Sequence, residues 1–149
     1  GLVSDLAVEI NAENNWWGCN AGPADEACLD ITGLVDADPW LVLTFTADQT
    51  KLIPGGVIHL TADLSQNSAG ADTSAQGAVM DGLLINFDAT YGTLDPLSAG
   101  LVNASTATTL SVPAPVTVTS ATVWALFDNE AVEIVFGGQH YIFLPIISR

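Results

Sequence analysis

The residues best suited to chemistry lie close together between Asn14 and Pro23, in the stretch NNWWGCNAGP. Trp16 and Trp17 follow a pair of asparagines, and aromatic rings beside amide groups are a composition typical of sugar binding. Adjacent residues of an extended chain point to opposite faces, so we expect at least one ring to be buried, with its indole N–H donating to a backbone carbonyl. The alternatives are therefore a glycan site, for which Asn15 and Trp17 are the candidate contacts, and a buried structural corner.

The two cysteines of the chain, Cys19 and Cys28, flank a short loop of Gly, Pro, Asp and Glu residues. A zinc site would need further Cys or His nearby, whereas His59 and His140 are distant in sequence. We predict a disulfide that closes this loop and adds about 2–3 kcal/mol of stability on the chain-entropy model. Two free thiols are the alternative. A disulfide would indicate an oxidising, extracellular setting.

The sequence contains no Gly-x-Ser-x-Gly elbow, no HExxH and no P-loop. His59 and His140 have no evident nucleophile beside them, and we interpret both as structural. Two acidic clusters, Asp36 with Asp38 and residues 128–130, could supply part of a Ca²⁺ shell, but neither is an EF-hand loop. We expect turns at both clusters, no enzyme activity and no cofactor, with Ca²⁺ binding as the alternative.

The charge balance excludes further classes of function. Seventeen acidic side chains face only Lys51 and Arg149 in a chain of 149 residues, which gives a formal net charge of −15. Such a surface repels phosphate backbones and anionic lipid, and no apolar run is long enough to cross a bilayer. We therefore expect no nucleic-acid binding and no membrane insertion. The sequence starts at Gly1 without a visible signal peptide, from which we expect a processed or excised segment.

Strand patterns dominate the chain, and 49% hydrophobic residues are enough for a core. Alternating apolar and polar residues occupy 6–10, 57–64, 83–89, 108–112, 116–118, 122–127 and 131–136. Turn residues separate these runs, and Asp128 with Asn129 is typical hairpin chemistry. The spacing predicts an all-β protein with a β-sandwich, in which we expect Trp40 and Trp124 to lie in the core.

Two family resemblances add to this interpretation. The segment INAENNWWGCNAGP, followed by Cys28 and by ITGLVDADPWL, resembles the closing segment of right-handed parallel β-helix domains in bacterial surface proteins. The resemblance covers residues 6–41 and implies that the Asn-Trp-Trp-Gly corner ends the last coils of a stack. The Pro-Trp-Leu stretch would then lead out of that stack.

The second resemblance covers residues 43–136. GGVIHLTADLSQNSAGADTS, DGLLINFDATYGTLDP and ATVWALFDNEAVEIVF resemble the bacterial immunoglobulin-like domains of invasin-type surface proteins. The sequence departs from that pattern at SAGLVNAST, where a Gly-x-Ala is usual. This resemblance implies a spacer or adhesin stalk without enzyme activity. The final HYIFLPIIS is similar to apolar tails of some secreted bacterial proteins.

These observations divide the chain into a β-helix-like terminal segment with a disulfide loop (1–40), an immunoglobulin-like sandwich (41–138) and an apolar C-terminal strand (139–149). One coil cannot cover its own interior, so preceding coils of the parent protein or another copy should cover it. The expected assembly residues are Leu6, Val8, Ile10, Tyr141, Ile142, Phe143, Leu144, Ile146 and Ile147. We expect a bacterial cell-surface protein that associates head to tail into a fibre or stalk. An adhesin or glycan-binding module is the alternative function, and pairing of the tail within its own sandwich is the alternative for the C-terminus.

Overall fold

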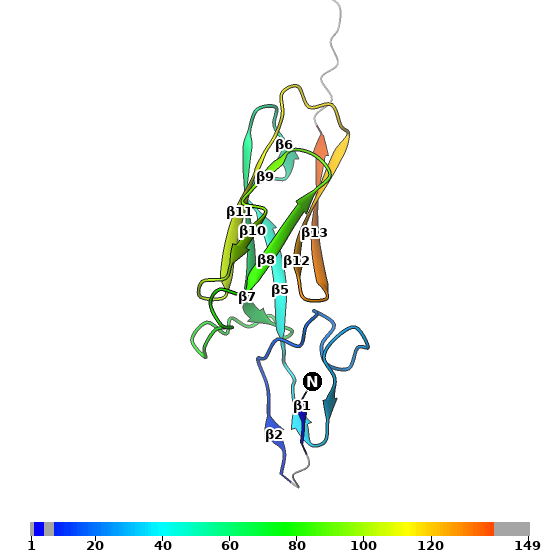
Figure 1. Ribbon diagram of the computed structural model, residues 1–149, viewed down its shortest axis with the longest axis vertical. Helices are drawn as coiled ribbons and strands as arrows, with labels where there is room; N and C mark the ends of the chain where they lie inside the picture. Colours follow the sequence, from blue (N-terminus) through cyan, green and yellow to red (C-terminus); the bar gives the residue numbers. More distant parts are fainter. Residues whose placement is uncertain (1, 5–7, 139–149) are drawn as a thin grey trace, which may run out of the picture.

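The computed structural model describes residues 2–4 and 8–138, which form thirteen β-strands and no helix. A small N-terminal module lies at one end of an elongated molecule, and a two-sheet β-sandwich forms the rest (Figure 1). The all-β prediction is confirmed for this part of the chain, which also contains no helix capable of crossing a membrane. Leu6, His140 and the whole predicted C-terminal strand, with its six assembly residues, lie outside the described residues.

The N-terminal module consists of two short parallel ladders. Strand β1 (Leu2–Val3) pairs with β3 (Ile31–Thr32), and β2 (Ile10–Asn11) pairs with β4 (Val35–Asp36). Parallel neighbours require a long connection, and here the segment between β2 and β3 carries the two tryptophans and both cysteines. The chain therefore makes one circuit and returns beside its own start.

Gly33, in the turn between β3 and β4, sets how closely the returning chain approaches the residue that follows β1. Its φ is 95°, and a Cβ at this position would overlap the carbonyl oxygen of Ser4. Glycine alone tolerates both the left-handed backbone and this contact between two main chains.

The first sheet of the sandwich is antiparallel, in the order β5-β7-β11-β9. Its strands are β5 (Leu41–Ala47), β7 (Val57–Asn67), β11 (Ser105–Ser111) and β9 (Thr93–Asp95). The long strand β7 lies between β5 and β11 and shows strict alternation of exposed and buried residues over most of its length. This alternation places one face of the sheet against the core.

The second sheet has the order β10-β8-β12-β13-β6. Its strands are β10 (Ser98–Gly100), β8 (Leu84–Ala89), β12 (Ser120–Phe127), β13 (Glu130–Gly138) and β6 (Lys51–Leu52). All neighbours are antiparallel except β6, which pairs in parallel with the end of β13. The predicted hairpin is confirmed, because β12 and β13 are joined by Asp128 and Asn129 alone.

The core lies between the two sheets, where the rings of Phe45 in β5 and Phe87 in β8 stack with centroids 6.0 Å apart. In β12 the small and branched residues at 121, 123 and 125 face inward and are at most 1% exposed. Trp124 is therefore on the outer face, where its indole N–H donates to Glu133 of the paired strand. The expectation of Trp124 in the core was wrong, since alternation separates two faces without saying which is inside.

A second prediction was wrong between β11 and β12. Residues 116–118 form no strand, although Val116 and Val118 pack against the core. Tyr91 holds this segment, because its hydroxyl donates to the carbonyl of Pro115 and accepts from the amide of Thr117, both at 3.2 Å. Proline has no N–H to donate to a ladder, which explains irregular backbone here.

Candidate functional site

The paired tryptophans of the NNWWGCNAGP stretch face opposite ways, as the alternation rule predicts. Trp17 is only 6% exposed and packs with Ala12 and Ala37 in the core of the N-terminal module. Trp16 turns toward the sandwich and packs against its core, with its ring stacked on Phe127 at 5.5 Å. Burial of one ring is confirmed. The corner therefore joins two hydrophobic cores.

The indole N–H groups do not follow the expectation of backbone partners. Trp16 donates to the carboxylate of Asp128 at 2.7 Å, and the buried Nε1 of Trp17 has no partner within residues 2–4 and 8–138. Of the tryptophans near the junction, Trp40 alone meets a backbone carbonyl, that of Asn20 at 2.9 Å. Trp40 is partly buried and packs against the module core, outside the core of the sandwich.

The turn of the β12–β13 hairpin rests on the Trp-Trp-Gly corner and its loop. The backbone amide of Asn129 donates to the carbonyl of Gly18 at 3.0 Å, and its side chain donates to that of Ala27 at 2.8 Å. Glu130 accepts from the amide of Asn20 at 2.7 Å. The hairpin turn therefore joins the sandwich to the N-terminal module through Asp128, Asn129 and Glu130.

Asn20 occupies the open edge of strand β5. Its side-chain nitrogen donates to the carbonyl of Leu43 at 2.9 Å, and its side-chain oxygen accepts from the amide of Leu43 at 2.6 Å. This amide side chain satisfies the donor and the acceptor that an edge strand otherwise presents to solvent. The same residue therefore binds the hairpin through its backbone and β5 through its side chain.

A backbone ladder continues from the module into the sandwich. Beyond β2 and β4, the amide of Ala12 donates to the carbonyl of Asp36 at 2.6 Å, and that of Asn14 to Pro39 at 2.6 Å. The amide of Leu41, the first residue of β5, donates to the carbonyl of Asn15 at 3.0 Å. The first residue of β5 is thus hydrogen-bonded to the N-terminal module and is also paired with β7, through Asn67.

The disulfide loop packs under Trp40. Cys19 and Cys28 are buried and bonded with Cα atoms 5.2 Å apart, which confirms the predicted disulfide. Gly22 in this loop has φ 83°, and a Cβ there would overlap the indole of Trp40. The loop and the Pro-Trp exit are therefore in direct contact.

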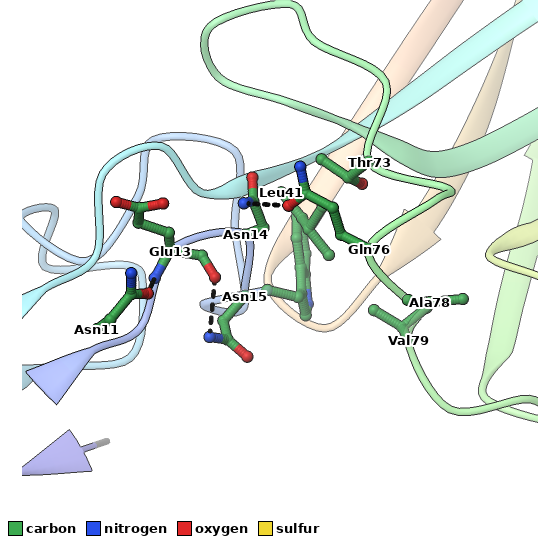
Figure 2. Close-up of a pocket in the computed structure, with 11 residues that line it drawn as sticks. Asn11, Glu13, Asn14, Asn15, Leu41, Thr73, Gln76, Ala78 and Val79 are labelled. Atoms are coloured by element: carbon green, nitrogen blue, oxygen red, sulfur yellow. Dashed lines mark hydrogen bonds between the residues drawn. The ribbon is translucent and has the colours of Figure 1, made fainter.

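A pocket of about 440 Å³ opens at the junction between the module and the loop that follows β7. It is lined by Asn11, Glu13, Asn14, Asn15, Trp16, Leu41, Thr73, Gln76, Gly77, Ala78 and Val79. Figure 2 shows Asn14 and Gln76 reaching toward each other from the two sides, and the Nδ2 of Asn14 donates to the Oε1 of Gln76 at 2.9 Å. The Oδ1 of Asn14 accepts from the Nδ2 of the buried Asn67, also at 2.9 Å.

The loop wall of the pocket is held by local hydrogen bonds. Asp72 accepts from the backbone amide of Ser74 at 2.8 Å, and Thr73 donates its hydroxyl to the carbonyl of Ser65 at 2.9 Å. The backbone hydrogen bond from Ser74, and then the bond from its hydroxyl, hold the pKa of Asp72 below its ordinary value. The loop is thus shaped by contacts that do not involve a ligand.

The predicted glycan contacts are separated by the fold. Asn15 is exposed and lines the pocket, whereas Trp17 is buried, so Trp17 cannot present its ring to a sugar. The aromatic ring in the pocket belongs to Trp16. The sequence did not distinguish Trp16 from Trp17 as the outward residue, because alternation does not identify which face is exposed. Val8 is 71% exposed and Ile10 lies in the β2–β4 ladder. His59 is exposed on β7.

No cluster of three or more His, Cys, Asp or Glu residues in the described part of the chain is placed to hold a metal ion. Asp36 accepts from the amide of Asp38 in a local turn. No protein-family model matches the sequence, and no curated protein matches it.

Proposed function

We propose that this chain is a non-enzymatic structural unit of an extracellular stalk or fibre, which joins stacked parallel β coils to a sandwich spacer. The observation that carries the proposal is the interlocked junction, where a continuous ladder, Trp16 and Asn20 tie the module to β5 and to the β12–β13 turn. Such contacts favour a fixed orientation of the two modules over independent motion of each.

The N-terminal module has features of a stack that continues. Strands β1 and β2 each pair on one side only, among the residues that the structure describes. Four apolar side chains of this small module, Val3, Val8, Leu29 and Leu34, are between 48% and 71% exposed. Exposed strand edges next to apolar surface favour pairing with another chain segment. The parallel circuit supports a β-helix end, whose covering neighbour is a preceding coil of the parent protein or a second copy.

The sandwich is suited to a spacer. If β5, β7, β8, β9, β11, β12 and β13 are given the letters A to G in chain order, the sheets become A-B-E-D and C-F-G. That order supports an immunoglobulin-like domain, with β10 and β6 added at the edges of the second sheet. Strand β5 starts at the junction and β13 ends at the opposite end of the molecule, so the chain passes through the sandwich lengthwise (Figure 1).

The disulfide supports an extracellular location, because such bonds persist in oxidising compartments. The net charge of −15 makes association between copies of the chain depend on salt concentration. Copies repel one another over about 30 Å at 0.01 M salt and over about 8 Å at physiological salt. We therefore expect association through the module to strengthen as salt is added.

The test is light scattering of the chain over a range of protein and salt concentrations. We expect association that depends on protein concentration, strengthens with salt and is reduced by Val8→Lys at the module. Met80→Lys is the matched control, because Met80 is 72% exposed, lies in a loop of the sandwich and receives the same charge change. A monodisperse monomer under all conditions would contradict a self-associating fibre.

A further inference from the structure

We propose that the pocket at the junction is a binding site for a neutral saccharide of about two sugar rings. Its volume of about 440 Å³ lies within the usual range for small-molecule sites, roughly 300–1,000 Å³. The site is largely separate from the surface used in the stalk function, since ten of its eleven lining residues lie outside the free-edged strands β1 and β2.

The charge of the pocket excludes anionic ligands. Glu13 is the one ionisable side chain among its lining residues, and no Lys, Arg or His is among them. With a net charge of −15 over the whole chain, a phosphate, sulfate or carboxylate would be repelled both locally and at long range. Anions are therefore excluded, and a lining that carries four amide side chains and a single carboxylate is suited to an uncharged polar ligand.

Of the four amide side chains that line the pocket, Asn14 is hydrogen-bonded at both ends, and the other three are each fixed at one end and available at the other. The Oδ1 of Asn11 accepts from the amide of Glu13 at 3.1 Å, and the Oε1 of Gln76 accepts from Asn14, which leaves both amide nitrogens as donors. The Nδ2 of Asn15 donates to the carbonyl of Ala12 at 2.9 Å, which leaves its oxygen as an acceptor. Figure 2 shows these side chains around the opening.

A sugar hydroxyl both donates and accepts hydrogen bonds, so neighbouring hydroxyls on a ring match a mixed set of amide donors and carboxylate acceptors. Because internal hydrogen bonds already orient these amides, binding costs little side-chain entropy. This arrangement distinguishes the pocket from an ordinary polar crevice.

The pocket also has an apolar wall against which a sugar ring can pack. Trp16 cannot rotate freely, because its N–H is held by Asp128 and its ring is stacked on Phe127. Its remaining surface lines the pocket together with Leu41 and Val79. The C–H face of a pyranose packs against such a ring, while the hydroxyls at its rim meet the polar groups opposite.

The test titrates the chain with maltose, cellobiose, lactose and N,N′-diacetylchitobiose, followed by tryptophan fluorescence and ligand-observed NMR. We expect saturable binding of at least one of them in the millimolar range or tighter. Ala78→Phe, which places a ring in the pocket, should weaken that binding at least tenfold. Ala75→Phe is the matched control, because Ala75 is exposed in the same loop without lining the pocket, and it should leave binding unchanged.

Three results would overturn the proposal: no saturable response to any of the four sugars, equal binding in Ala78→Phe and wild type, or equal binding of 3′-sialyllactose and lactose. Light scattering of the same samples separates this outcome from that of the stalk proposal. Loss of sugar binding in an Ala78→Phe protein that still associates concerns the pocket alone.

Discussion

The indole nitrogen of Trp16 donates a hydrogen bond of 2.7 Å to the carboxylate of Asp128, which lies 112 residues further along the chain. The bond joins the corner of a parallel coil to the turn of an antiparallel hairpin. Around it, the ring of Trp16 stacks on Phe127, and the hairpin turn hydrogen-bonds to Gly18. The junction of the two modules is thus built around one side chain.

Trp16→Phe keeps the aromatic contact with Phe127 and removes the donor to Asp128. We expect a loss of about 1 kcal/mol in the free energy of unfolding, because the bond is solvent-exposed. Hydrogen exchange should increase at the amides of Asn129 and Asn20, which donate to the Gly18 carbonyl and to Glu130 across the junction. Trp124→Phe is the control, since it removes a comparable exposed bond, to Glu133, within the sandwich. Equal exchange at the junction in both variants would contradict the role assigned to Trp16.

Asn20→Ala should open the edge of β5. The amide and the carbonyl of Leu43 lose their partners together, and we expect a destabilisation of about 1–3 kcal/mol, measured by chemical denaturation. Exchange of the Leu43 amide should accelerate. In Asn20→Asp the acceptor remains and the donor is lost, so the effect on the Leu43 amide should be clearly smaller than in the alanine variant. Unchanged exchange of that amide in Asn20→Ala would refute this interpretation.

Gly22→Ala tests the contact between the disulfide loop and Trp40. The added Cβ overlaps the indole, and overpacking of this kind costs about 1–3 kcal/mol beyond the backbone strain. Gly70→Ala is the control, because its φ of 78° resembles the 83° of Gly22 while no atom lies within 4 Å of the added Cβ. The difference in melting temperature between the two variants therefore reports the packing. Equal melting temperatures would show that Trp40 moves aside without cost.

Acidification should release the Asp72 turn at a lower pH than for an ordinary aspartate. The hydrogen bonds from Ser74 lower the folded-state pKa, so the ionised carboxylate stabilises the turn at neutral pH. That contribution is lost as the pH falls through the lowered pKa. The measurement is the amide shift of Ser74 by NMR during an acid titration, compared with an unstructured peptide covering residues 70–78. A midpoint equal to that of the peptide would exclude the proposed hydrogen bonding.

The elements with strong local patterns could be predicted from the sequence. Alternation located β7, β8, β12 and β13, and Asp128 with Asn129 marked the hairpin turn. The short strands β6, β9 and β10 have two or three residues each, which is too few for a period of two to be recognised. Their pairing depends on neighbours that are distant in sequence.

The candidate site was harder to predict, because alternation identifies two faces but not their surroundings. It separated Trp16 from Trp17 correctly and did not identify which one lines the pocket. The same ambiguity placed Trp124 on the wrong face. Gln76, Ala78 and Val79 carry no local pattern that predicts a site, since they become lining residues only where their loop meets the N-terminal module.

The ladder between residues 12–15 and 36–41 has a mechanical consequence. Its hydrogen bonds join strands that run along the long axis of the molecule (Figure 1). Tension applied between β1 and the end of β13 pulls these two segments in opposite directions along their lengths. The bonds then share the load in shear and do not open one at a time. A pull along the axis therefore meets more resistance at this junction than one that peels the N-terminal module sideways.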